Sequence, residues 1–181
     1  MRDRYESLKP SMIVSSMASM PRRWRAAIRV DPPKNIDDFF TVPGPDGVSA
    51  AEHAGAAIAQ LTVLSRAIRT TSYRIPETLD PEVAAAAQNL GSGPWPKTAA
   101  EALTELDAVF DDIKTQLDQL HTNDWNKSAR VASAGAPDDG DESATGSATG
   151  SLSVLQLAQA ASRVAAERLP LAERILRTVS R

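Results

Sequence analysis

The stretch at residues 98–121, TAAEALTELDAVFDDIKTQLDQLH, shows the helical repeat of this chain most clearly. Apolar side chains recur there at steps of three and four residues, which places them on one face of an α-helix. They are Leu103, Leu106, Phe110, Ile113, Leu117 and Leu120. The charged residues between them lie off this face, where we expect water. The stretch therefore predicts an amphipathic helix over 99–121 with one buried stripe.

The same start signal occurs three times along the chain. A hydroxyl residue is followed three positions later by Glu or Gln in Ser49-Ala-Ala-Glu52, Thr98-Ala-Ala-Glu101 and Ser153-Val-Leu-Gln156. In such a capping box the two side chains bind amide groups that the first turn of a helix leaves unpaired. Since a long apolar repeat follows each box, we predict helices over 50–70, 99–121 and 154–179.

A further helix is predicted over 5–30, with less regular spacing. Pro10 and Pro21 interrupt it, and an interior proline removes a hydrogen bond and bends the helix. Pro170 is expected to bend the last helix in the same way. The inner face of the first helix is predicted to hold Leu8, Met12, Met17, Met20, Trp24 and Ile28.

The connections between these helices differ in kind. Residues 31–47 form a loop rich in Pro and Gly, and residues 71–97 form a long connection with a short helix predicted over 81–90. A connection of that length can cross the molecule instead of forming a tight hairpin. Residues 132–150 are small and acidic, and they predict a mobile loop because they bury too little apolar surface to offset the entropy of ordering.

These elements predict one all-α domain over residues 1–181. We expect an up-and-down four-helix bundle with a long crossover between the second and third helices. The 181 residues suffice for one core. Apolar residues make up 42% of the chain and aromatic residues 4%, which indicates a core of aliphatic side chains.

Composition excludes several classes of function. A net charge of −3 argues against a nucleic-acid-binding protein, which needs a basic surface. The absence of cysteine excludes thiolate chemistry and disulfides. No apolar run approaches the roughly 20 residues that span a bilayer, and the N-terminal residues lack the apolar core of a signal peptide. We therefore expect a cytoplasmic protein that does not bind membranes.

The order of these parts resembles a known family. A first helix leads to a Pro/Gly loop, and the second helix opens with Ser-Ala-Ala-Glu-His at residues 49–53. After the crossover, the acidic third helix ends in Leu-His-Thr-Asn-Asp-Trp, and the last begins with Leu-Ser-Val-Leu-Gln-Leu. The whole resembles the DinB/YfiT-like superfamily, which includes the N-terminal domains of mycothiol-dependent maleylpyruvate isomerases.

The resemblance implies a four-helix bundle and a divalent metal held by three histidines, one near the start of the second helix and two on the fourth. His53 matches the first of these positions. The matching pairs on the fourth helix are Arg163 with Glu167, or Val164 with Arg168, and neither contains histidine. The chain has two histidines in all. We therefore predict neither a three-histidine metal site nor any cofactor.

Four residues are the candidate ligand-binding set: His53, Glu167, Arg168 and Arg163. His53 would bind a ligand or move a proton; otherwise it is a partly buried histidine held by one hydrogen bond. The three charged residues would replace the metal by an anion-binding or ion-paired centre, since arginine binds carboxylates in a bidentate manner. Otherwise they form ordinary ion pairs on the helix surface.

Two other motifs have simpler interpretations. Asp118 and His121 have the spacing of ligands in di-metal bundles, but such sites need two copies of the motif. We expect His121 to lie in the last turn of its helix instead, where the helix dipole favours a cation. Trp24, flanked by arginines, is predicted to be a core residue between solvated charges.

Three functional hypotheses follow. The first is a bundle without the metal site that binds a small, acidic molecule near His53 or acts without catalysis. The second is a thiol-dependent transferase or isomerase in which His53 and a charged residue of the last helix act. The third is an interaction module that forms a homodimer through apolar helix faces.

Overall fold

The chain folds mainly into helices, and its computed structural model describes residues 4–29, 35–73, 78–88, 95–132 and 150–181. The long helices of this part are α1 (Pro10–Ala27), α3 (Ala50–Tyr73), α5 (Ala99–Asp118) and α6 (Val154–Val179). The shorter elements are α2 (Asp37–Phe40), α4 (Pro81–Ala87), the 3-10 helix η1 (Asp124–Asn126), and the strands β1 (Thr78–Leu79), β2 (Ser128–Val131) and β3 (Ser151–Ser153). The predicted all-α class is therefore confirmed for most of the chain, with a small sheet added. Within the described ranges, no helix is both long and apolar enough to cross a membrane.

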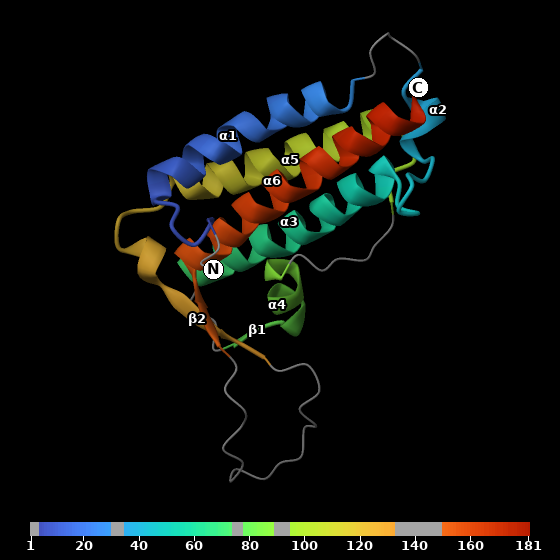
Figure 1. Ribbon diagram of the computed structural model, residues 1–181. Coiled ribbons are helices and arrows are strands. Elements are labelled where there is room, and N and C mark those ends of the chain that lie inside the picture. The colour runs from blue at the N-terminus through green and yellow to red at the C-terminus, as the bar shows by residue number, and fades with distance from the viewer. Residues whose placement is uncertain (1–3, 30–34, 74–77, 89–94, 133–149) are drawn as a thin grey trace, which may run out of the picture.

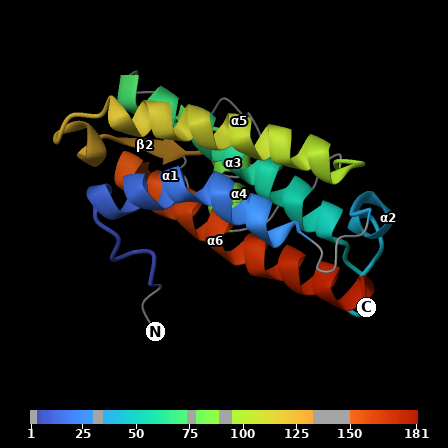
Figure 2. The same cartoon turned by 90° about the horizontal axis from the view of Figure 1, so that it is seen from above.

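The long helices lie side by side, each packed mainly against two others, in the order α1, α5, α3, α6 around a common core (Figure 1, Figure 2). Ser65 of α3 bonds to Asp112 of α5, and Tyr73 at the end of α3 bonds to Gln119 just after α5. These two helices therefore run in the same direction. A carboxylate oxygen of Asp46, which precedes α3, lies 3.8 Å from a guanidinium nitrogen of Arg174 near the end of α6. Helices α3 and α6 are therefore antiparallel.

The directions of the long helices differ from the sequence prediction at one pair of helices, α3 and α5. An up-and-down order makes consecutive long helices alternate, and α3 and α5 do not alternate. Parallel neighbours need a connection that returns along the pair, and the long segment between α3 and α5 provides it. On the way this segment forms β1 and α4, and α4 packs against α3. The long crossover predicted from the sequence is present, whereas the alternation is wrong for this pair.

The crossover ends at a close contact with α3. Trp95 lies so near the backbone of Gly55 that a Cβ atom there would approach its ring carbon Cε3 to 2.5 Å. Only glycine leaves enough space for this approach. The glycine therefore seats the crossover on α3 just before α5 begins.

The predicted N-terminal caps are present with one variation. The Ser49 hydroxyl accepts from the Glu52 amide (3.2 Å), and the Glu52 carboxylate accepts from the Ser49 amide (2.7 Å). Ser153 with Gln156 makes the same reciprocal pair at the start of α6. At α5 the carboxylate of Glu101 accepts from the amide of Lys97 instead of completing the box. Caps of this kind explain why the starts of these helices were predicted correctly.

The predicted first helix is too long at its N-terminus. The helix starts at Pro10, which occupies its first turn, where a proline lacks no hydrogen bond that the helix would make. Ile13 is buried at the next turn, whereas Met12 is 52% exposed, so the assignment of Met12 to the core is wrong. Met17, Met20 and Trp24 are buried as predicted. Pro21 lies inside the helix.

The predicted third helix is too long at its C-terminus. The helix ends at Asp118, and His121 lies beyond it in an exposed turn. The prediction that His121 occupies the last helical turn is therefore wrong. The core stripe is confirmed at Leu106, Phe110, Ile113 and Leu117, which are buried, whereas Leu103 and Leu120 are only partly buried.

A three-stranded sheet was not predicted. Strand β2 pairs in parallel with β1 and antiparallel with β3, in the order β1-β2-β3. Strands of two to four residues are too short to show a period of two in sequence. The predicted acidic loop leaves this sheet at Ala132 and returns at Gly150, and its residues 133–149 lie outside the described ranges.

Candidate ligand-binding site

The four residues of the predicted site divide between two places on α6. His53, near the start of α3, lies within the electrostatic influence of Arg168, on the C-terminal half of α6. Arg163 lines a cavity at the N-terminal end of the same helix, together with residues that precede α1. The described lining of that cavity contains neither His53 nor Arg168. The structure therefore does not assemble the predicted set into one centre.

His53 is a buried residue of α3. Its side chain is 6% exposed, and within the described part of the chain neither Nδ1 nor Nε2 has a partner. Burial lowers the pKa of its imidazole, and the positive charge of Arg168 lowers it further. Asp46 and Glu52 raise this pKa, but with smaller effect. The imidazole is therefore neutral at pH 7.

The surroundings of His53 hold few ligands for a metal. Among the residues that the structure describes, no group of three or more His, Cys, Asp or Glu side chains is placed to hold a metal ion. The Glu52 carboxylate already accepts from Ser49 in the capping box. Gln60 lies on the same face of α3 seven residues further on, 1% exposed, and its amide atoms have no partner within the described ranges. This face of α3 is closed against solvent.

Arg168 and Glu167 are neighbours on α6. Both side chains are half-buried. Burial lowers the pKa of the Arg168 guanidinium, and the negative charge of Glu167 raises it. A guanidinium keeps its charge at all ordinary pH values, so Arg168 adds a fixed positive charge beside His53. This charge disfavours an imidazolium or a metal ion there.

The Arg163 cavity has a volume of about 690 Å³, within the range of small-molecule sites in proteins. The Arg163 guanidinium donates to the backbone oxygen of Ala87 at the end of α4, so this side chain is held in place. The lining is both polar and apolar: Tyr5, Glu6, Ala87, Leu152, Ser153, Leu155, Gln156, Gln159, Ala160 and Arg163. A held guanidinium beside an apolar wall is an arrangement that binds a carboxylate with a hydrocarbon part.

The N-terminal segment forms one wall of this cavity. The Gln159 amide nitrogen donates to the backbone oxygens of Glu6 (3.0 Å) and Leu8 (3.1 Å). The segment therefore lies beside the first turns of α6 (Figure 1). Sequence reasoning missed Tyr5 and Glu6 as site residues because they lie some 150 positions from α6. No local pattern signals a contact over that separation.

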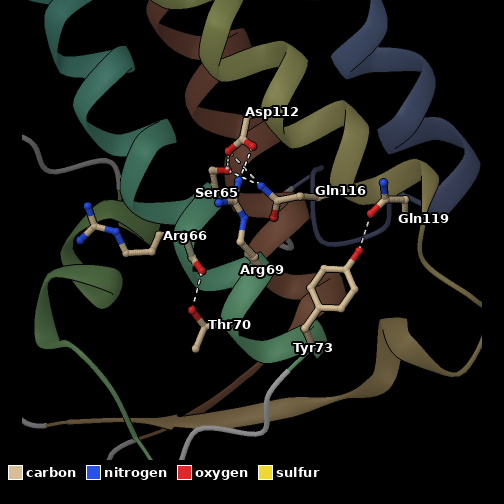
Figure 3. Close-up of polar contacts among 8 residues, drawn as sticks. All are labelled: Ser65, Arg66, Arg69, Thr70, Tyr73, Asp112, Gln116 and Gln119. Atoms are coloured by element: carbon tan, nitrogen blue, oxygen red, sulfur yellow. Dashed lines mark hydrogen bonds and ion pairs between the residues drawn. The ribbon is translucent and has the colours of Figure 1, made fainter.

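A second polar cluster joins α3 to α5 (Figure 3). The Ser65 hydroxyl donates to Asp112 (2.5 Å), Gln116 donates to both of them, and Arg69 forms an ion pair with Asp112. The Tyr73 hydroxyl donates to Gln119 (2.5 Å) nearby. The carboxylate of Asp112 is thus fully engaged by its neighbours, so this cluster holds two parallel helices together. Its residues were not identified from the sequence.

Asp118 and Trp24 occupy the places that simple packing predicts. Asp118 forms an ion pair with Lys114 on the surface of α5. Trp24 is fully buried, and the neighbouring Arg25 forms an ion pair with Asp107 of α5. These residues form no centre with His121.

Comparison of the chain with protein-family models, with curated proteins and with solved structures finds no significant match.

Proposed function

We propose that this chain is a four-helix bundle of the DinB/YfiT-like type that binds a small acidic molecule and holds no three-histidine metal centre. The four long helices around one core, the long connection before α5 and the place of His53 near the start of α3 support the assignment. The chain's two histidines, His53 and His121, are too few for the family's metal site. We thus propose that the chain shares the architecture of this superfamily but not its metal chemistry.

The binding site that we propose is the Arg163 cavity. One observation carries this choice: a guanidinium held by the Ala87 carbonyl lines a cavity of about 690 Å³ that also has apolar walls. Arg163 belongs to the set that the sequence suggested, but His53 does not line this cavity. His53 is almost completely buried, so it suits an internal role better than ligand capture.

Calorimetry with simple carboxylates tests this function. We expect acetate, butyrate, benzoate and phenylacetate to bind with affinities that rise with apolar size, because Leu152 and Leu155 offer an apolar surface. Arg163→Leu is expected to weaken phenylacetate binding about tenfold or more, since hydrogen bonds to a charged group contribute about 1.5–3 kcal/mol. Arg163→Lys is expected to retain part of the affinity, because it keeps the charge and loses the bidentate geometry.

Arg177→Gln is the matched control. This arginine lies on the same helix but pairs with Glu173 at the far end, away from the cavity. Its affinity for phenylacetate should equal that of the unmodified chain. Equal binding by Arg163→Leu, with its helical content unchanged, would overturn the proposed site. Stoichiometric zinc or nickel in the purified protein, lost in His53→Ala, would overturn the metal-free assignment.

A further inference from the structure

The Arg163 cavity is lined by two residues of opposite charge. Arg163 comes from the third turn of α6, and Glu6 comes from the segment before α1. They are the two members of the described lining that belong to the acidic and basic residue types Asp, Glu, Lys and Arg. A ligand with a carboxylate alone would meet one favourable and one unfavourable charge. The walls therefore suit a ligand that carries both a negative and a positive charge.

The position of Glu6 relative to α6 is held by hydrogen bonds. The buried side chain of Gln159 donates to the backbone oxygens of Glu6 and Leu8, which tie the segment to the helix one turn before Arg163. The Glu6 side chain is exposed and belongs to the lining of the cavity, so a ligand in the cavity can reach it. A fixed anchor with an accessible carboxylate is what an ammonium group requires.

Arg4, the basic residue nearest to Glu6 in this segment, contacts Tyr5. The guanidinium of Arg4 lies over the ring of Tyr5, 4.7 Å from its centroid, and donates to the Tyr5 hydroxyl (2.6 Å). Arg4 is therefore engaged with Tyr5, and no ion pair joins it to Glu6 among the described contacts.

We infer that the ligand of this cavity is zwitterionic, with a carboxylate bound by Arg163, an amine bound by Glu6 and an apolar side group on Leu152 and Leu155. Free amino acids with an apolar side chain and short peptides belong to this class. The inference rests on the proposed acid-binding function and narrows it. The volume of about 690 Å³ accommodates a ligand of that size.

Three ligands that share a phenyl ring test the inference on the full chain: phenylacetate, phenylalanine and phenethylamine. Calorimetry should give phenylalanine the highest affinity, about threefold to fivefold above phenylacetate. The gain is modest because an exposed ion pair contributes less than about 1 kcal/mol. Phenethylamine should bind more weakly than both, since it lacks the group that Arg163 holds.

Glu6→Gln should remove the advantage of phenylalanine over phenylacetate and leave phenylacetate bound equally well or better. Glu105→Gln, which removes an exposed carboxylate from α5, is the matched control and should keep the advantage. If phenylacetate binds through Arg163 and phenylalanine binds no better, the inference of a zwitterionic ligand is wrong and the acid-binding function stands. If none of the three binds, the proposed function itself fails.

Discussion

The two halves of α6 place arginines in opposite settings. The positive charge of Arg168 acts on His53, whose ring is buried and has no hydrogen-bond partner among the residues that the structure describes. Arg163, little more than one turn earlier, lines an accessible cavity formed with the N-terminal segment and α4. Both arginines are half-buried, and their surroundings differ: a buried histidine near Arg168 and a cavity at Arg163. The comparison teaches that a charged residue on a helix indicates a site only when the neighbouring elements leave space around it.

Two alanines of α6 test this difference with the largest expected effect. Ala172 is fully buried in the C-terminal half of α6, which we call the closed half, and Ala160, which is 8% exposed, lines the cavity. Ala172→Leu should lower the free energy of unfolding by about 1–3 kcal/mol, because a packed core has no space for the added atoms. Ala160→Leu should cost clearly less and should reduce phenylacetate binding. Urea denaturation and calorimetry measure both, and equal losses of stability would remove the distinction between the halves.

Replacing the two polar residues by leucine should have effects of opposite sign. His53→Leu should raise the free energy of unfolding by about 1 kcal/mol, because it removes a buried polar group that makes no hydrogen bond within the described ranges. Arg163→Leu should lower it by about 1 kcal/mol, since its bond to the Ala87 carbonyl is lost. Thermal denaturation measures both. A loss of stability above about 1 kcal/mol in His53→Leu would show that His53 has a partner in solution.

Stability should depend on pH through the closed half. The folded pKa of His53 lies below its unfolded value, so the unfolded state binds the proton first as the pH falls. Stability is therefore full above the ordinary histidine pKa of about 6.5 and falls as the pH drops through and below it. His53→Leu should remove this part of the pH dependence of urea denaturation. His121→Gln is the matched control, since His121 is exposed, and an unchanged slope in His53→Leu would contradict the expectation.

The smallest effect is expected at the exposed end of α6. Arg177→Gln removes one surface ion pair with Glu173, and such pairs contribute less than about 1 kcal/mol. Both thermal stability and phenylacetate affinity should stay close to those of the unmodified chain. A marked loss of affinity would show that the binding site extends beyond the Arg163 cavity.

Local signals in the sequence predicted the helices well. The starts of α3, α5 and α6 follow from Ser49, Thr98 and Ser153, because a cap depends on residues three positions apart. The end of α6 at Val179 was also predicted. Errors arose where no cap marked the boundary, as at Pro10.

The candidate site was predicted only in part. Arg163 was identified, but Glu6 and Tyr5 were not, because their contact with α6 joins residues at opposite ends of the chain. The separation of Arg163 from His53 also escaped prediction, since helical spacing gives the face of a residue and not the elements that cover it.

By itself, the sequence determined the mostly helical class, the caps and the absence of a third histidine, because these depend on residue types and short spacings. Only the tertiary structure decided the rest: the parallel packing of α3 and α5, the small sheet, the enclosure of His53 and the opening around Arg163. The physical reason is that the arrangement of helices and the solvent access of their side chains depend on contacts between distant segments. The spacing of apolar residues along one segment does not indicate which distant segments contact it.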